Sequence, residues 1–316
     1  MPPAPRSSLP WGIVTVKCAL TRLAGACRLH GRPAEAQTFV AQALALLGAH
    51  DPALSHTYLT RGLLAYDAGR FAEAEEDQRR GIALAMQARD PAAAWGLVNL
   101  GVALRQQKRE DETLLAYRLA EQLFVEIDDV ANLAAVRMNI GNVYLMRDQF
   151  QEALHWYNLA EPTFRQTEDR YRLSDIYLNR GIAQRSLGHL AVARADFERS
   201  LVYHRALNRV VGVAAIADAV GVTDMLEGDY ASARTLHRGA ALLTSIGAQD
   251  GPRGSWCGRT WRNWRTTEVV TTALAQVVAT SVALGTTEVV TTVLAWVVAT
   301  LVARGRLKSS LRCLRG

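Results

Sequence analysis

The sequence predicts an all-α protein: a right-handed superhelical solenoid of about six helical hairpins, followed by a low-complexity C-terminal tail that we expect to be helical. Three observations lead to this prediction. Glycines recur at nearly constant intervals, apolar residues make up 49% of the 316 residues, and only 9 prolines occur. A chain of this composition can form a large core, and the scarcity of proline favours long helices.

The period of the repeat is set by glycine. The spacings between successive glycines are 39, 40, 40 and 40 residues, at Gly62, Gly101, Gly141, Gly181 and Gly221. An earlier and weaker copy carries Ala24 at this position. Because two helices pack closely only where one presents a small side chain at the crossing, we expect each glycine to lie on the first helix of a hairpin, facing the second helix.

Three further columns keep the same period. Twelve residues after the glycine position come small residues: Ala36, Ala74, Thr113, Ala153, Ala193 and Ala233. Sixteen residues after it comes a larger, aromatic-rich column: Val40, Gln78, Tyr117, Tyr157, Phe197 and His237. Nineteen residues after it come Ala43, Gly81, Ala120, Ala160, Ser200 and Ala240. We expect the small residues to lie at the helix crossing, and the larger residue to fill the groove one turn further on.

Turn and cap residues complete the hairpin. Seven residues after the glycine position we expect a left-handed helix cap, at Gly31, Gly69, Lys108, Asp148, Gly188 and Gly228. Asp51 and Asp90 each precede a proline, and Asp129 and Asp169 lie in the same column. These aspartates are predicted to cap the first helix of the following hairpin.

These columns resemble the tetratricopeptide repeat family over residues 13–247. The commonest unit of that family has about 34 residues, and the longer unit here resembles the longer-helix branch found in bacterial signalling proteins and peptide-binding scaffolds. Departures from the pattern are Ala24, Thr113 and Gln78. The resemblance implies a solenoid in which the first helix of each hairpin lines a concave surface.

The domain prediction has five parts. They are an N-terminal extension (1–12), the repeat solenoid (13–247), a Trp/Arg-rich linker (248–265), two 20-residue tandem repeats (266–305) and a basic C-terminal end (306–316). The net charge of +6 comes from the tail, because residues 251–316 carry +7 and the preceding residues −1. Each tandem repeat begins with Thr-Thr-Glu and ends in glycine, which favours a helix. Strands and membrane spans are weaker alternatives, and a frameshifted or repeat-expanded coding end is another.

Asparagine stands two residues before the glycine in three consecutive copies, as Asn99, Asn139 and Asn179. The helical period places this position toward the concave wall. In the family that the repeats resemble, the equivalent asparagine often bonds to the backbone of an extended peptide, and a carboxamide has the donor and acceptor for this. The alternative is that asparagine is common at this position of such repeats whatever they bind, and has no role in ligand binding here.

The same wall supplies the predicted specificity residues. The full set of predicted peptide-binding residues is Trp95, Asn99, Arg105, Met138, Asn139, Asn142, Leu178, Asn179 and Arg185. Val98, Val102, Leu145 and Ile182 lie on the same wall by the same spacing. Apolar side chains with two arginines suit an extended segment of some acidic character.

Motifs of catalysis are not found. The chain lacks a phosphate-binding loop, a dinucleotide fingerprint, a zinc-protease helix and a nucleophile elbow, and its 4 cysteines form no Cys-x-x-Cys pair. The apolar run that ends at Lys17 is short for a signal peptide. We therefore expect no enzyme activity, no catalytic or metal-binding residue, no cofactor and a cytoplasmic location.

Three functions remain as hypotheses. The first is a protein–protein interaction scaffold that binds an extended peptide or partner segment in the concave groove. The second is a regulatory sensor array of a larger bacterial signalling protein, with a peptidase, cyclase or transcription-activator domain elsewhere. The third, which we consider less favoured, is nucleic-acid binding through the basic tail.

Overall fold

The computed structural model describes residues 11–48, 51, 53–237, 239 and 241. Within these ranges the regular structure is helical, and no strand is found. The chain divides into two compact units, Met1–Met146 and Arg147–Gly316. The prediction of an all-α chain of hairpins is confirmed. The predicted linker, tandem repeats and basic end lie outside the described residues.

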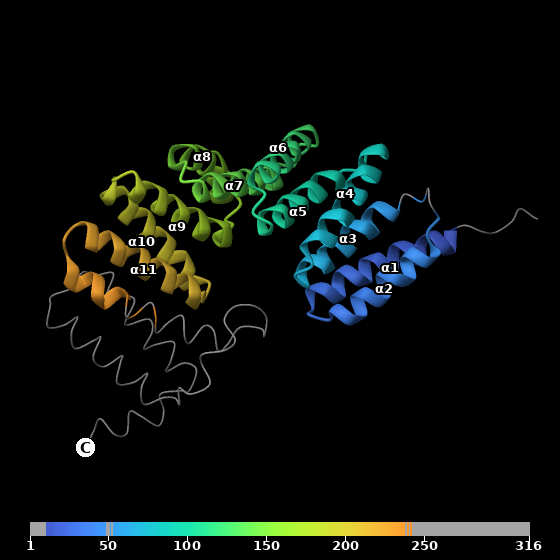
Figure 1. Cartoon of the computed structure of the whole chain (residues 1–316), viewed down its shortest axis with the longest axis horizontal. Coiled ribbons are helices and arrows are strands. Elements are labelled where there is room, and N and C mark those ends of the chain that lie inside the picture. The colour runs from blue at the N-terminus through green and yellow to red at the C-terminus, as the bar shows by residue number, and fades with distance from the viewer. Residues whose placement is uncertain (1–10, 49–50, 52, 238, 240, 242–316) are drawn as a thin grey trace, which may run out of the picture. The chain divides into compact units, whose positions relative to one another are not determined.

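The first unit contains seven of the described helices (Figure 1): α1 (Trp11–Leu29), α2 (Pro33–Leu46), α3 (Ala53–Asp67), α4 (Phe71–Gln87), α5 (Ala92–Gln106), α6 (Glu110–Glu126) and α7 (Val130–Met146). Helices α1 and α2, α3 and α4, and α5 and α6 pack together as hairpins, and each second helix also contacts the first helix of the next hairpin. The hairpins of this unit therefore stack in chain order, as the forty-residue period predicts.

The second unit contains α8 (Phe150–Gln166), α9 (Arg170–Ser186), α10 (Leu190–Ala206) and α11 (Val210–Leu226). Residues 230–237 begin one more helix. Helix α9 packs against both α8 and α10, and α10 packs against α11. The packing order is that of the first unit.

The turn inside each hairpin has the predicted left-handed residue. The φ angles are +69° at Gly31, +74° at Gly69, +59° at Lys108, +56° at Asp148, +82° at Gly188 and +88° at Gly228. Glycine adopts this conformation without steric cost, whereas the lysine and the aspartate do not. Position in the repeat therefore decides the turn conformation even where the residue type is unfavourable.

A second left-handed position joins one hairpin to the next, and the sequence did not reveal it. It is occupied by Arg89, Asp128, Glu168 and Asn208, with φ between 52° and 55°. Each of the first three is followed directly by a predicted capping aspartate. The caps are confirmed: the backbone N–H groups of Ala53, Ala92, Asn132 and Arg172 donate to Asp51, Asp90, Asp129 and Asp169, at 2.8 to 3.1 Å.

The core lies where the columns meet. The alanines of the crossing are buried, and Tyr117, Tyr157 and Phe197 are each 0% exposed. A Cβ atom on Gly101 would lie 2.3 Å from Cε1 of Tyr117, and one on Gly181 would lie 2.6 Å from Cε1 of Phe197. The glycine column therefore exists because an aromatic ring occupies the space that a side chain would need.

Candidate functional site

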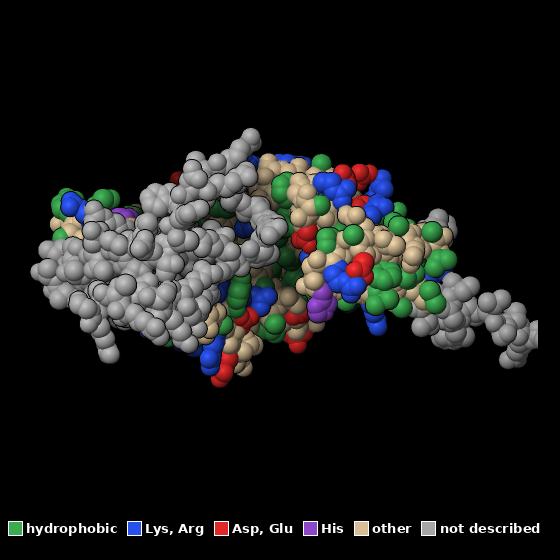
Figure 2. Space-filling model, turned by 90° about the horizontal axis from the view of Figure 1, so that it is seen from below, with side chains coloured by type: hydrophobic (Ala, Val, Ile, Leu, Met, Phe, Trp, Pro, Cys, Tyr) green, Lys and Arg blue, Asp and Glu red, His purple; other side chains and the backbone are tan. Residues whose placement is uncertain are grey.

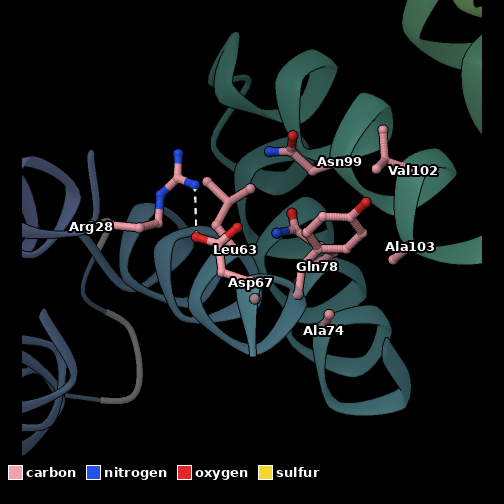
Figure 3. Close-up of a pocket in the computed structure, with 10 residues that line it drawn as sticks. Arg28, Leu63, Asp67, Ala74, Gln78, Asn99, Val102 and Ala103 are labelled. Carbon is pink, nitrogen blue, oxygen red and sulfur yellow. Dashed lines mark hydrogen bonds and ion pairs between the residues drawn. The ribbon is translucent and has the colours of Figure 1, made fainter. Parts of the chain in front are cut away.

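A pocket opens in the first unit between α1, α3, α4 and α5 (Figure 3). Its volume is about 210 Å³, and its lining consists of Arg28, Gly62, Leu63, Tyr66, Asp67, Ala74, Gln78, Asn99, Val102 and Ala103. Two of these residues, Asn99 and Val102, belong to the predicted ligand-binding wall. The other pocket residues were not predicted as site residues.

The pocket forms at a departure from the repeat pattern. Gln78 occupies the aromatic-rich column, sixteen residues after Gly62. In the hairpins with Tyr117 and Phe197, an aromatic ring covers the corresponding glycine. Gln78 has no ring, but its side chain takes the same place, because a Cβ atom on Gly62 would lie 2.6 Å from Gln78 Nε2. Both residues line the pocket. The sequence marks this position, since Gln78 stands in a column where the next three hairpins have an aromatic residue.

Gln78 is a buried polar group with one unused acceptor. Its side chain is 1% exposed, and its Nε2 donates to the carbonyl oxygen of Leu59 at 2.9 Å. Its Oε1 has no hydrogen-bond partner among the described residues. A buried acceptor without a partner costs about 1–3 kcal/mol. Gln78 therefore contributes to the pocket wall a buried oxygen for which a hydrogen-bond donor would be stabilising.

Asn99 enters the pocket from α5, opposite Gln78 (Figure 3). It is half-buried, and within the described part of the chain its side chain makes no hydrogen bond. At the rim, Arg28 Nη1 lies 3.0 Å from Asp67 Oδ2. The Tyr66 hydroxyl accepts a hydrogen bond from Gln106 Nε2 at 3.0 Å. The pocket thus contains a neutral pair of carboxamides beside a charged pair whose members neutralise each other.

The remaining predicted residues of the first unit lie on α5 and α7. Trp95 is 42% exposed, and its ring lies edge-on to Phe124, with 6.2 Å between the ring centroids. Half-buried positions are held by Arg105, Met138, Asn139 and Asn142. Over the ranges that the structure covers, Asn139 makes no side-chain hydrogen bond. The two helices therefore carry partly accessible polar and apolar groups.

In the second unit, two predicted residues have partners inside the protein. The side chain of Asn179 forms a hydrogen bond with the Tyr157 hydroxyl; burial raises the pKa of Tyr157, and this bond opposes the rise. Arg185 Nη1 donates to the carbonyl oxygen of Ala219 at 3.0 Å, and burial lowers the pKa of Arg185. Leu178 is half-buried. Here Asn179 and Arg185 contribute to the fold, which the pattern alone did not show.

Ion pairs between the two helices of a hairpin are a further feature that the sequence reasoning missed. Arg61 binds Asp77 through two contacts of 2.6 and 2.7 Å, and Arg180 binds Asp196 through two contacts of 2.7 and 2.8 Å. Each arginine directly precedes a repeat glycine, and each aspartate follows sixteen residues later. That spacing is the signal that could have identified these pairs.

Several charged side chains of the surface form ion pairs. Figure 2 shows basic and acidic side chains next to one another on the exposed face. Examples are Arg79 with Glu75, at 3.0 Å, and Arg109 with Glu112, at 2.6 Å. Among the described residues no group of three or more His, Cys, Asp or Glu side chains is placed to hold a metal ion. Likewise, none of the helices described combines the length and apolar character that crossing a membrane requires.

Comparisons with known proteins agree with this architecture. Residues 90–166 and 132–206 match the family model described as tetratricopeptide repeat. No curated protein sequence matches the chain. Hairpins stacked in order, with the first helices presenting accessible polar groups, define a helical-repeat protein. Residues 90–206 therefore consist of tetratricopeptide repeats.

Several solved structures share the fold. BtubC (BKLC) from P. vanneervenii has a TM-score of 0.56 and 17% identity, covering 80% of this chain and 97% of that one. PilF from Pseudomonas aeruginosa has a TM-score of 0.56 and 17% identity, covering 76% and 100%. A signal transduction ATPase with numerous domains from Pyrococcus horikoshii, which has a tetratricopeptide repeat sensor, has a TM-score of 0.64 and 13% identity. That match covers 77% of this chain and 39% of the ATPase. At these identities the likeness concerns the fold alone.

Proposed function

We propose that the chain is a non-catalytic interaction scaffold, which binds an extended peptide or partner segment along α5 and α7 of the first unit. The observation that carries this proposal is the state of Asn99 and Asn139. Both are half-buried, and neither side chain has a hydrogen-bond partner among the residues described. A carboxamide in this state can donate to and accept from a peptide unit. Such bonds are independent of the guest's side chains.

The neighbours of these asparagines supply the contacts that depend on guest sequence. Trp95 is 42% exposed and anchored against Phe124, so it offers a rigid apolar surface. Tryptophan is enriched among the residues that contribute most to binding. Met138 and Val102 are half-buried on the same two helices. The guest is therefore expected to carry apolar side chains at intervals.

Charge favours some acidic character in the guest. Arg105 is half-buried near the end of α5, and within the described ranges it forms no ion pair. A carboxylate of the guest would gain a charge-assisted hydrogen bond there. Arg185, which binds a backbone carbonyl of α11, is not needed for this contact.

The test is a double variant, Asn99→Ala with Asn139→Ala, in the full-length chain. Twelve-residue peptides selected on the wild-type chain from a random display library serve as guests. We expect the dissociation constant to rise roughly tenfold or more, since each lost hydrogen bond contributes about 1 kcal/mol. Circular dichroism and thermal melting are expected to match the wild type, because neither asparagine bonds within the described residues.

A matched control removes carboxamides from the second helices of two hairpins. Gln87→Ala with Gln122→Ala changes exposed residues on α4 and α6, and we expect it to leave affinity unchanged. Equal affinity of the Asn99/Asn139 variant and the wild type for every selected peptide would overturn the proposal.

A regulatory array joined to an effector domain is the second candidate. The observation that favours it is the change of sequence after Gly247, where the forty-residue period stops. The genomic DNA around the coding region, read in all frames, provides the test. An in-frame peptidase, cyclase or transcription-activator domain supports this candidate, and DNA without such a domain contradicts it.

A further inference from the structure

We infer that the pocket between α3, α4 and α5 is a specificity site for a neutral carboxamide side chain, that of an asparagine or glutamine in the bound segment. The inference rests on the proposed function and adds the chemical class of side chain that the scaffold selects. Four properties of the pocket support it: an unused acceptor, the partner opposite that acceptor, the pocket's size and its charge.

The unused acceptor is Gln78 Oε1. The side chain is 1% exposed, its amide nitrogen is engaged with Leu59, and its oxygen has no partner among the described residues. A guest group that donates a hydrogen bond to this oxygen relieves the cost of burying it unpaired. An apolar guest side chain would leave that cost in place.

The partner opposite is Asn99, which lines the same pocket from α5 (Figure 3). Its amide can donate while Gln78 Oε1 accepts, so the pocket presents one donor and one acceptor of neutral type. A guest carboxamide has the complementary pair on one flat group. A hydroxyl or a carboxylate pairs less completely with this donor and acceptor than a carboxamide does.

Size excludes larger ligands. Pockets for drug-sized molecules and cofactors occupy about 300–1,000 Å³, and this pocket has about 210 Å³. An engineered cavity of about 150 Å³ holds a benzene molecule. The volume therefore suits one side chain, whose methylene groups would contact Leu63, Val102 and Ala103.

Charge excludes ionised side chains. The interior of the pocket is neutral, and the charged residues at its rim, Arg28 and Asp67, are bound to each other at 3.0 Å. A carboxylate or ammonium entering the pocket would lose hydration without gaining an unpaired opposite charge. Glutamine is therefore preferred to glutamate, and asparagine to aspartate, although the two side chains compared in each case are nearly equal in shape.

Water competes for the pocket, and it does not remove the selectivity. Ordered water can bond to polar groups of the lining such as Asn99, but a guest group that reproduces its hydrogen bonds displaces it without loss. An apolar or charged group of the same size does not reproduce them. Hydration therefore sharpens the preference for a carboxamide.

The experiment uses three probes that share one backbone: the N-acetyl N-methylamides of glutamine, glutamate and leucine. Each is titrated into the full-length, ¹⁵N-labelled chain while side-chain amide resonances of Gln78 and Asn99 are followed. We expect saturable shifts of both resonances with the glutamine probe. Affinity for the glutamate and leucine probes should be roughly tenfold lower, because neither pairs with both carboxamides.

Two variants locate the effect. Gln78→Tyr restores the aromatic column, and we expect it to fill the pocket, abolish probe binding and raise the melting temperature. Its control is Gln87→Tyr, the same change at an exposed position of α4, which should bind the probe as the wild type does. Gln78→Met keeps the chain length and removes the acceptor. It should bind the glutamine and leucine probes equally.

Equal affinity of the wild type for all three probes would overturn the inference, since the pocket would then not select a carboxamide. Probe binding that persists in Gln78→Tyr would also overturn it. Neither result affects the scaffold proposal, which depends on the response of long peptides to the Asn99/Asn139 variant. Conversely, selective probe binding without any effect of that variant would support the pocket and contradict the scaffold.

Discussion

The hairpin α3–α4 of the first unit and the hairpin α9–α10 of the second share one construction. In each, an arginine on the first helix binds an aspartate on the second through two contacts: Arg61 with Asp77, and Arg180 with Asp196. Each arginine directly precedes a repeat glycine. The two hairpins are therefore held together by the same pair in the same place.

They differ at the residue that faces the glycine. In α9–α10 the ring of Phe197 covers Gly181, and Phe197 is 0% exposed. In α3–α4 the place is taken by Gln78, whose Nε2 would lie 2.6 Å from a Cβ atom on Gly62. Gln78 also lines the pocket, together with residues of α1, α3 and α5. A polar side chain can therefore replace the aromatic ring against the glycine without any change in the backbone pattern of the repeat.

The largest expected effect comes from giving α9–α10 the residue of α3–α4. Phe197→Gln removes a fully buried ring and introduces a polar group, so we expect the second unit to lose about 4 kcal/mol of stability. Native-state hydrogen exchange of the α10 amides measures this. A loss below about 1 kcal/mol would show that the ring of Phe197 contributes little to the packing of α9 against α10.

The ion pairs provide the next effect. The side chain of Asp196 is 1% exposed and that of Arg180 is 13% exposed, whereas Asp77 and Arg61 are 8% and 38% exposed. Removing one member of a buried pair leaves an uncompensated charge, so Asp196→Ala should cost about 3 kcal/mol.

Solvent can reach Arg61, so the matched variant Asp77→Ala should cost about 1 kcal/mol. Denaturant unfolding, followed by hydrogen exchange in each unit, compares the two losses. Equal losses would mean that exposure of the arginine does not decide the contribution of the pair.

The asparagines give a smaller effect. Asn179→Ala removes the hydrogen-bond partner of the buried Tyr157 hydroxyl, and we expect a loss of about 1–2 kcal/mol in the second unit. Asn139→Ala should change stability by less than about 0.5 kcal/mol, since its side chain bonds to no described residue. Thermal melting of the two single variants tests this. Equal destabilisation would show that Asn139 also serves the fold.

The smallest effect depends on pH. His204 on α10 is 1% exposed, and burial lowers its pKa from 6.5. The groups facing it are Ser200, Asp175 at 3.8 Å and Arg209. The unfolded chain binds more protons than the folded chain between the two pKa values, so stability is complete above about pH 6.5 and falls as the pH drops toward the folded value.

Hydrogen exchange between pH 5 and 8 should therefore show α10 losing protection at the acidic end. The corresponding residue of α4 is Ala85, which is 0% exposed and carries no titratable group. We expect α4 to lack this dependence, and His204→Gln to remove it from α10. A wild-type slope that persists in His204→Gln would assign the effect to another group.

Much of the fold was predictable because it depends on local rules repeated in register. Lys108 and Asp148 adopt the left-handed conformation although neither is a glycine, and they were identified by column alone. The four aspartate caps followed from residue type and position. The junction residues, such as Arg89 and Asn208, were missed because no residue type marks them.

The site was less predictable, because it depends on packing between residues that are distant in sequence. The sequence identified Gln78 as an exception to its column, but the unused acceptor appears only once Leu59 is seen to occupy the amide nitrogen. Asn99 and Asn179 occupy the same position of the repeat, two residues before its glycine. They differ in the structure because Tyr157 has a hydroxyl that Asn179 reaches.

The recurring junctions between hairpins have a consequence for how this gene can change. Arg89–Asp90, Asp128–Asp129 and Glu168–Asp169 share a left-handed first residue. In each, the aspartate accepts a hydrogen bond from a backbone N–H group at the start of the next helix. A deletion or duplication that starts at one junction and stops at another rejoins equivalent ends. Whole hairpins can thus be exchanged as modules, and recombination can move a hairpin along the array without the need for a new turn.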